Sequence, residues 1–339
     1  MVFAKKGDGW RVCIDCRGLN NITVKNSYPL PLISELQDRL QGAQRFTKFD
    51  ISGAYNRIRM KEGEGWKMAF RTRFGLYEYL VMPLGLTHAP ATFQTFINNG
   101  LRKYLDVFVA VYLDDILVYS KTLEKHVQHV AKVLAALQDS RLKIKPEKSE
   151  FRRKEVIFLG YIVSRDGQKK DGNKIKTILE WPTPRTVNEV LSFLGFAKFY
   201  RGFIGQYYKI AAPMTKLTKK DQAFFWNAAA QKAFDELKNR FTSQPSLVMF
   251  DLNKPITVET DASDKALGAC LSQPWTGGKL QPVAYHSRKL SPPELNYDIH
   301  DVIDLQGRHG LLQCFRAFHK LHVLPIEITR ASNDDLLGC

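Results

Sequence analysis

The order of apolar and polar residues divides the chain into short strands and helices. Residues 46–50 (FTKFD) alternate with the period of a strand and lead into a turn and a short helix within ISGAYNRIRM. Residues 67–82 (KMAFRTRFGLYEYLVM) predict a hairpin centred near Gly75, and the apolar spacing in 123–139 (LEKHVQHVAKVLAALQD) predicts an amphipathic helix. A further helix is expected over 88–105, where Pro90 falls in the first turn and is tolerated.

The composition and the predicted secondary structure of the second half of the chain change twice along its length. A basic, strand-forming stretch at 141–164 (RLKIKPEKSEFRRKEVIFLGYIVS) precedes the proline-rich break WPTPRT at 181–186, and helical patterns follow to about residue 220. ITVETDAS at 256–263 opens a separate strand-rich region that continues to about residue 288. The chain has no internal repeat, no P-loop and no G-x-G-x-x-G. These elements predict an α+β protein of two or three domains.

One short run, VYLDDILVYS at 111–120, places two adjacent acids inside an otherwise apolar stretch. The flanking segments FVAVYL and ILVY predict two strands, joined by a two-residue turn made of Asp114 and Asp115. Such a turn normally prefers Asn-Gly or Asp-Gly, because its central residues need positive φ. Two carboxylates about 4 Å apart also repel by about 4 kcal/mol at an effective dielectric constant near 20. The pair is therefore either a solvated acidic turn or a site that needs both charges.

A third acid, Asp50, ends the apolar strand FTKFD 64 residues before Asp114 (114 − 50), which leaves ample chain for that strand to lie beside the hairpin. Three carboxylates on one sheet face would be neutralised by two divalent cations about 4 Å apart. Such a pair activates a primer 3′-hydroxyl and stabilises the leaving pyrophosphate in phosphoryl transfer. Two Mg²⁺ ions fit hard carboxylate oxygens better than zinc does, and Mn²⁺ is a second candidate.

The charge of the chain points to its partner. Fifty Lys and Arg residues against 34 Asp and Glu give a net charge of +16, which indicates a polyanion such as nucleic acid. The alternative is a basic surface without a specific partner. No apolar run approaches the roughly 20 residues of a membrane span, and the first residues lack the apolar core of a secretory signal. We expect an intracellular protein, cytoplasmic or nuclear, with no membrane partner and no evident organelle targeting.

The five cysteines are dispersed and odd in number, which indicates reduced thiols. Cys13 and Cys16 form a C-x-x-C, and His126 and His129 could complete a Cys₂His₂ zinc site. The two halves lie far apart in sequence and lack the local composition of a zinc module. Structural, reduced cysteines are the better interpretation.

The motifs around the acids resemble those of the reverse transcriptase family. Tyr112-Leu-Asp-Asp115 resembles its catalytic box, and FTKFDISGAYNRIRM (46–60), MPLGLTHAPATFQ (82–94) and FLGYIVS (158–164) resemble neighbouring motifs, in order and at the family's spacing. The similarity is greatest to the pol polyprotein of gypsy-type LTR retrotransposons, especially fungal ones, and runs from about residue 3 to about residue 300. It implies a right-hand polymerase fold of fingers, palm and thumb. The implied partners are an RNA or DNA template with its primer, and deoxynucleoside triphosphates.

The resemblance also implies roles for single residues near the chemistry. Asp50, Asp114 and Asp115 correspond to the metal ligands of the polymerase site. Tyr55 corresponds to the aromatic ring that lies under the sugar of the incoming nucleotide and clashes with a 2′-hydroxyl. Lys148 lies where the family has a lysine that could protonate pyrophosphate.

Residues that would contact nucleotide, template or primer come from several places on the chain. They are Lys5 or Lys6 with Arg11, which would grip the triphosphate; Gly85 in the loop beside the template–nucleotide pair; Gln94 at the start of the helix behind that loop; Tyr112 before the acids; and Phe158, Leu159, Gly160 and Tyr161 in the primer grip. These assignments rest on the resemblance alone.

The implied domains are fingers and palm over 1–165 with the fingers incomplete at the N-terminus, thumb or connection over 166–224, the first part of an RNase H-like α/β domain over 225–300, and a divergent tail over 301–339. Asp261 corresponds to the first RNase H metal ligand. The family's next acid lies in a helix after YDIHD, where this chain has VIDLQ, and no T-D-H box follows. The tail resembles the product of a shifted reading frame. We therefore expect a partial, inactive RNase H-like domain whose sheet keeps an exposed edge.

The prediction is a right-hand polymerase followed by a partial RNase H-like domain, which adds deoxynucleotides to a primer along a template. A catalytically inactive retroelement relic that only binds nucleic acid is the alternative from a different class. A nuclease or integrase-like enzyme built on the same three acids is weaker, because it needs neither Tyr55 nor the loop at Gly85. Primer identity and oligomeric state do not follow from the sequence.

Overall fold

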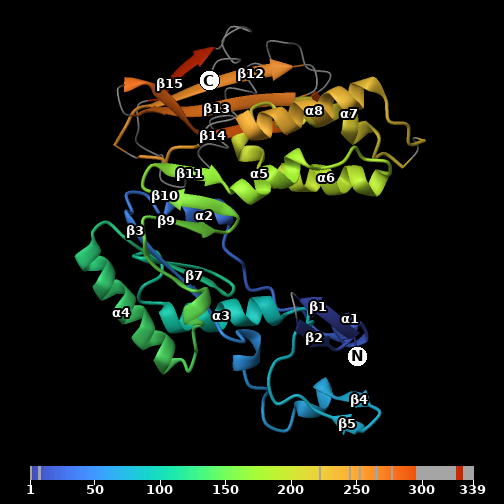
Figure 1. Cartoon of the computed structure of the whole chain (residues 1–339), viewed down its shortest axis with the longest axis vertical. Coiled ribbons are helices and arrows are strands. Elements are labelled where there is room, and N and C mark those ends of the chain that lie inside the picture. The colour runs from blue at the N-terminus through green and yellow to red at the C-terminus, as the bar shows by residue number, and fades with distance from the viewer. Residues whose placement is uncertain are drawn as a thin grey trace. The chain divides into compact units, whose positions relative to one another are not determined.

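A computed structural model describes residues 2–6, 9–220, 223–243, 246–251, 253–263, 266–275, 278–294 and 326–330. The chain forms two compact units, Met1–Leu159 and Gly160–Cys339, each treated separately below (Figure 1). The sequence predicts a domain boundary after residue 165, and the division into these two units falls after Leu159, within the FLGY motif. None of the described helices is long and apolar enough to span a membrane.

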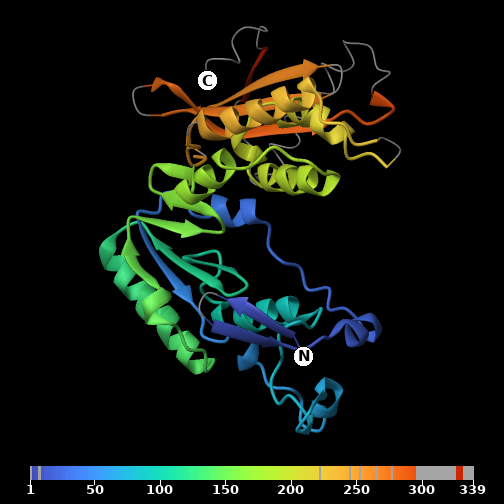
Figure 2. The same ribbon diagram turned by 45° about the vertical axis from the view of Figure 1, so that its right-hand side comes forward.

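The first unit is built around an antiparallel sheet with the strand order β6-β7-β3-β8. Its strands are β3 (Arg45–Asp50), β6 (Val109–Tyr112), β7 (Asp115–Ser120) and β8 (Glu150–Arg153). Helices α3 (Ala89–Leu101) and α4 (Leu123–Asp139) pack on this sheet (Figures 1 and 2). Strands β3 and β7 pair along their full length, from Arg45 opposite Ser120 to Asp50 opposite Asp115.

Both helices begin where the sequence predicts. Pro90 lies in the first turn of α3, where its missing N–H costs nothing. The hydroxyl of Thr122 accepts a hydrogen bond from the Lys125 N–H and caps α4, which covers the predicted residues 123–139 without any shift. Local capping and apolar periodicity therefore determined these two elements.

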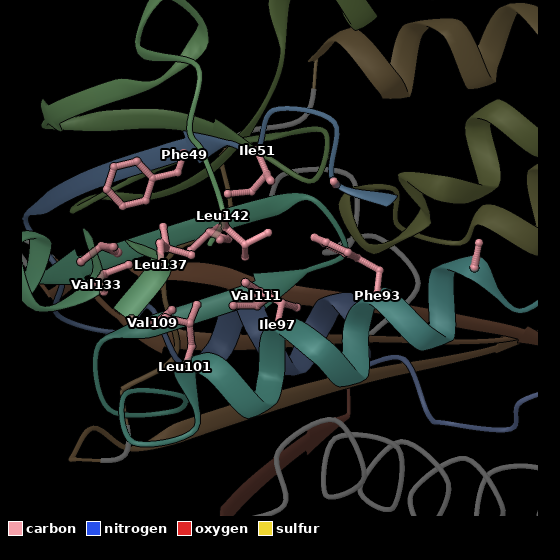
Figure 3. Close-up of a cluster of buried hydrophobic side chains, with 14 of the residues drawn as sticks. Phe49, Ile51, Phe93, Ile97, Leu101, Val109, Val111, Val133, Leu137 and Leu142 are labelled. Carbon is pink, nitrogen blue, oxygen red and sulfur yellow. The ribbon is translucent and has the colours of Figure 1, made fainter. Parts of the chain in front are cut away.

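The core of the first unit lies between α3 and the sheet. Phe93, Ile97 and Leu101 are spaced four residues apart on one face of α3 and point toward Val109 and Val111 of β6 (Figure 3). All five side chains are almost fully buried, and each such burial stabilises the fold by about 1.5–3 kcal/mol. The same cluster includes Phe49 of β3 and Val133 and Leu137 of α4. It fixes the sheet on which the acids stand.

Smaller elements complete the first unit. They are the hairpin β1 (Val2–Lys6) and β2 (Gly9–Cys13), α1 (Arg17–Ile22), α2 (Ile33–Asp38), the hairpin β4 (Phe70–Thr72) and β5 (Gly75–Tyr77), β9 (Glu155–Phe158), and short 3₁₀ helices at Tyr55–Arg57, Gly65–Met68 and Pro146–Lys148. The hairpin expected near Gly75 is present, with Gly75 at φ 140° as the first residue of β5.

The second unit combines helices with a sheet in the order β14-β13-β12-β15. Its helices are α5 (Gly172–Leu179), α6 (Val187–Phe199), α7 (Tyr207–Lys216) and α8 (Ala228–Ser243), with a 3₁₀ helix at Arg201–Phe203. Its strands are β10 (Tyr161–Ser164), β11 (Gly167–Lys170), β12 (Ile256–Ser263), β13 (Ala266–Pro274), β14 (Leu280–Lys289) and β15 (Ile326–Arg330). Helices α7 and α8 lie along one side of the sheet (Figures 1 and 2).

The expectation of an exposed sheet edge is wrong at β12. Strand β15, from the tail that the sequence had left without a structure, pairs in parallel with β12 from Ile256 opposite Ile326 to Thr260 opposite Arg330. The segment IEITR alternates apolar and polar residues, which is the pattern of a strand. The backbone groups of β12 that would otherwise attract another chain are therefore paired. Residues 295–325 and 331–339 lie outside the described residues.

Candidate active site

Asp50 and Asp115 are directly opposite one another at the end of the β3–β7 ladder. Asp50 is the last residue of β3 and Asp115 the first of β7, so antiparallel pairing brings these two distant acids together. Asp114 precedes Asp115 and is exposed. The side chains of Asp50 and Asp115 are each 38% exposed. The structure thus gathers the three acids singled out by the sequence at one end of the sheet.

The turn between β6 and β7 lies one residue earlier than the sequence suggested. Tyr112 and Asp115 form the last pair of the ladder, so the turn consists of Leu113 and Asp114. Of these two, Leu113 takes the positive φ, at 53°. A leucine in this left-handed region costs about 1–2 kcal/mol. The shift matters because side chains alternate along a strand, and it makes Asp115 the partner of Asp50.

The side chain of Gln94, in helix α3, hydrogen-bonds to the backbone of this strained turn. Its side-chain oxygen accepts a hydrogen bond of 2.7 Å from the Leu113 N–H, and its amide nitrogen donates to Asn98 Oδ1 at 2.9 Å. Gln94 is completely buried in the second turn of α3, and not at the helix start as the sequence had suggested. Burial places Gln94 where it fixes the backbone of the acidic turn.

Two lysines contact the carboxylates. Lys145 Nζ donates to Asp50 Oδ1 at 2.8 Å, and Lys48 Nζ lies 3.3 Å from Asp115 Oδ1. Sequence reasoning missed both. Lys48 could have been found, because it precedes Asp50 by two residues and a strand places such residues on one face. Lys145 gave no local signal, since its position depends on pairing with residues beyond Asp50.

The electrostatics of the site reflect close like charges. Burial raises the pKa of the Asp115 carboxyl, Lys48 lowers it, and the charges of Asp114 and Asp50 raise it further. Burial, and then the charge of Asp114, raise the pKa of the Tyr55 hydroxyl. The charges of Asp114 and Asp50 therefore both reach the Asp115 carboxyl.

The donor set suits a hard divalent cation, because each of the three acids offers carboxylate oxygens. Within the described residues, however, no three His, Cys, Asp or Glu side chains are close enough together to hold a metal ion. Asp50 and Asp115 are turned toward lysine amines instead. The chemistry of the donors fits a cation, while their side chains are arranged around ammonium groups.

Tyr55 lies near Asp114, and Gly85 lies in a turn of the same unit. The Tyr55 ring packs against Phe93, with ring centroids 5.5 Å apart. Burial and the charge of Asp114 raise the pKa of the Tyr55 hydroxyl. Gly85 has φ 104°, a conformation that favours glycine. Asn20, which sequence reasoning missed, fixes this loop: its side chain donates to the Gly85 carbonyl at 2.9 Å and accepts from the Thr87 N–H at 2.8 Å.

The basic residues predicted to contact substrate lie on two separate elements. In the β1–β2 hairpin Lys5 pairs with Trp10, Lys6 with Gly9, and Ala4 with Arg11. Lys148 is exposed at the end of the 3₁₀ helix Pro146–Lys148, and the lysine that reaches Asp50 is Lys145.

The residues predicted to grip the primer form a turn with mostly buried ends. Leu159 and Gly160 have positive φ, at 50° and 85°. Phe158 is buried in the first unit. In the second unit, Tyr161 is 7% exposed, stacks on Phe199 and donates its hydroxyl hydrogen to the Phe199 carbonyl at 3.0 Å. Burial strongly raises the pKa of Tyr161. Tyr161 is thus part of the second unit's core.

The remaining candidates are Asp261, the two cysteines of the C-x-x-C and the two histidines. Asp261 is in β12 opposite Gly268. Cys13 and Cys16 are free thiols, and His126 and His129 both bond Ser120 Oγ, at 3.0 and 2.8 Å. These histidines are therefore engaged in a hydrogen-bond network of the first unit.

Comparison with known families identifies two regions of the chain. Residues 3–163 match the reverse transcriptase (RNA-dependent DNA polymerase) family, and residues 226–321 match the RNase H-like domain found in reverse transcriptase. Residues 3–163 therefore belong to the reverse transcriptase family. The RNase H-like match extends 21 residues (321 − 300) past the point where we expected the resemblance to end.

Curated relatives include the Transposon Tf2-3 and Tf2-7 polyproteins of Schizosaccharomyces pombe. Each is 40% identical over 301 residues, which is 89% of this chain and 23% of the relative. The chain thus spans less than a quarter of the length of these transposon polyproteins, and the gypsy-type resemblance agrees with them.

Solved structures of similar fold include foamy viral protease–reverse transcriptase in complex with RNA/DNA hybrid and with double-stranded DNA. The TM-scores are 0.81 and 0.84 at 22% identity, over 97% and 98% of this chain and 44% and 68% of those chains. At that identity the likeness establishes the reverse transcriptase and RNase H-like folds.

Proposed function

We propose that this chain is an RNA-directed DNA polymerase that adds deoxynucleotides to a primer 3′-hydroxyl by a two-cation mechanism. The observation that carries the proposal is the pairing of Asp50 with Asp115, beside Asp114, in a region of the reverse transcriptase family. Divalent cations bound by these carboxylates would activate the 3′-hydroxyl and neutralise the leaving pyrophosphate.

The protein's own groups give the site its shape. Gln94 fixes the turn that carries Asp114, so the acids need little reorganisation when substrate arrives. The Tyr55 ring, supported by Phe93, would exclude a ribose 2′-hydroxyl. Asn20 sets the loop at Gly85, whose missing side chain would let a base pair approach. Lys5, Lys6 and Arg11 would bind the triphosphate, and Phe158 to Tyr161 would position the primer.

The proposed partners are a primer–template and deoxynucleoside triphosphates. A net charge of +16 supports a phosphate-rich partner. The foamy viral proteins of similar fold were solved with RNA/DNA hybrid and with double-stranded DNA. Affinity for primer–template should therefore fall steeply with salt and depend little on sequence.

For the RNase H-like domain we propose little or no hydrolytic activity. Asp261 is the one ligand that the motif supplies, and the segment after YDIHD lacks the family's acidic helix. A single carboxylate cannot hold two magnesium ions against their hydration shells. Magnesium-dependent degradation of the RNA strand of a hybrid, lost in Asp261→Asn, would overturn this part.

Primer extension on an RNA template with magnesium tests the main proposal. Asp50→Asn and Asp115→Asn should each reduce extension by about a thousandfold or more, because both carboxylates serve the transition state. Primer–template binding should stay within about threefold. Asp139→Asn, an exposed acid at the end of α4, is the control and should extend normally.

The same assay separates the proposal from its alternative. A parent chain that binds primer–template but extends nothing with magnesium or manganese would be the non-catalytic relic. Variants of Asp50 and Asp115 that extend within a few-fold of the parent would show that the acids are not the catalytic site.

A further inference from the structure

Two lysine ammonium groups contact the carboxylates that would bind divalent cations in the proposed function. Lys145 Nζ lies 2.8 Å from Asp50 Oδ1, and Lys48 Nζ lies 3.3 Å from Asp115 Oδ1. Each pair is partly buried, with the lysine side chains 32% and 21% exposed. Each amine therefore places a positive charge beside one of the three carboxylates.

The backbone of Lys145 is joined to that of Asp50 by one direct hydrogen bond and by two hydrogen bonds through Ser149. The Lys145 N–H donates to the Asp50 carbonyl at 2.9 Å. Ser149 Oγ donates to the Lys145 carbonyl at 2.7 Å and accepts from the Asp50 N–H at 3.2 Å. Their neighbours, Ile144 before Lys145 and Ile51 after Asp50, form an isolated β-bridge. An ion pair supported by this many backbone bonds is a built feature of the fold.

The two lysines differ in what else they touch. Lys48 Nζ also donates to the Ile157 carbonyl at 3.1 Å, so it keeps a partner if Asp115 turns away. Among the described residues, the hydrogen-bond partner of Lys145 Nζ is Asp50. Its amine is therefore the easier of the two to release into solvent.

We propose that Lys145 is a displaceable counterion of the active site. In the cation-free protein its ammonium neutralises Asp50 and keeps the three acids assembled against their mutual repulsion. A divalent cation competes with it for the same carboxylate, so Lys145 lowers cation affinity. The inference rests on the proposed function and deepens it, and it assigns Lys145 a positioning role beside Asp50.

Manganese binding followed by the electron paramagnetic resonance of the free ion tests this directly. Lys145→Gln keeps every backbone bond and removes the competing charge, so it should tighten Mn²⁺ binding about two- to fivefold, the factor that matches the strength of an exposed ion pair. Lys145→Arg keeps the charge and should bind as the parent does. Lys148→Gln is the matched control, since Lys148 is exposed and three residues away, and it should not change binding.

A second readout is the rise in melting temperature on adding magnesium. It should be larger for Lys145→Gln than for the parent and for Lys148→Gln, because the cation then replaces a charge that is missing. The difference between Lys145→Gln and parent should shrink at high salt, as expected of partly exposed charges.

Equal or weaker Mn²⁺ binding by Lys145→Gln, with binding that Asp50→Asn still abolishes, would overturn the counterion role and leave the proposed function standing. Parent protein with no Asp50-dependent Mn²⁺ binding would instead overturn the proposed cation site, and the counterion inference with it. A folding defect in Lys145→Gln would appear as a lower melting temperature without metal. Lys145→Met then serves as the second variant, and it should show the same tightening of Mn²⁺ binding.

Discussion

The side-chain oxygen of Gln94 accepts a hydrogen bond of 2.7 Å from the backbone N–H of Leu113. This contact joins the core helix α3 to the turn that carries Asp114, and it holds Leu113 at its positive φ of 53°. The position of Asp114, a proposed catalytic acid, therefore depends on a buried, uncharged residue 20 positions earlier (114 − 94) in the sequence.

Gln94→Leu should slow nucleotide addition far more than it weakens primer–template binding. The substitution leaves the partly buried Leu113 N–H without its Gln94 partner, at a cost of about 1 kcal/mol, and the turn relaxes to avoid that cost. We expect the extension rate at saturating substrate to fall about tenfold or more, measured by single-turnover primer extension.

Gln37→Leu is the control for this variant. Gln37 is also a buried glutamine of the first unit, in α2, and its amide nitrogen has no hydrogen-bond partner among the described residues. Its replacement should leave the extension rate unchanged. Similar losses in both variants would mean that glutamine burial, and not the contact with Leu113, matters.

Tyr55→Ala should increase incorporation of ribonucleotides while deoxynucleotide addition stays within about tenfold of the parent. The ring packs on Phe93 beside Asp114, where it would clash with a 2′-hydroxyl. Competing ribo- and deoxynucleotides in a primer extension assay measure the preference. Tyr55→Phe keeps the ring and should keep the selection. Unchanged discrimination in Tyr55→Ala would make the ring a packing residue only.

The first unit should lose stability between about pH 6.5 and pH 4. Burial, then His129, Arg45 and Arg152, lower the pKa of His126 to about 4. The unfolded chain therefore takes up a proton in this range before the folded one does, and the stability falls as pH falls. The loss from His126 is on the order of 2–3 kcal/mol. Hydrogen exchange of amides in β7 and α4 measures it locally.

His126→Gln provides the control for the pH effect. His126 is fully buried and bonds Thr47 Oγ1 at 2.7 Å and Ser120 Oγ at 3.0 Å, so a neutral amide can replace part of this network. The variant should show a lower stability at pH 7 and a shallower slope below it. His129, whose pKa burial also lowers, accounts for the remaining slope. An unchanged slope would assign the effect elsewhere.

Lys170→Met should stabilise the second unit by about 1–3 kcal/mol at neutral pH. The amine is buried, has no hydrogen-bond partner among the described residues, and lies 5.2 Å and 5.1 Å from the ring centroids of Phe203 and Phe241. Burial lowers its pKa to about 8. The stability of the parent should therefore rise between about pH 8 and pH 10.5, while the unfolded chain still holds the proton.

Denaturant unfolding of parent and variant at pH 7 and pH 10.5 tests this prediction. The two proteins should differ most at pH 7 and converge as the parent amine loses its charge. Lys169→Met, at an exposed neighbouring position, should change little. A destabilised Lys170→Met would show that the two rings stabilise the ammonium more than burial opposes it.

The sequence by itself determined the elements and the identity of the three acids. The periodicity and cap of residues 122–139 fix α4, and alternation fixes FTKFD as a strand that ends in Asp50. These signals are local, because a helix cap or a strand period depends on neighbours within a few residues. The order and spacing of the motifs were sufficient to place the chain among reverse transcriptases.

Only the tertiary structure decided which groups meet at the site. The turn register that sets Asp115 opposite Asp50, the hold of Gln94 on Leu113, the reach of Lys145 to Asp50 and the pairing of β15 with β12 all join distant parts of the chain. Each depends on a balance between backbone pairing and burial across the whole unit. No short window of sequence contains both partners, so no local pattern could have predicted them.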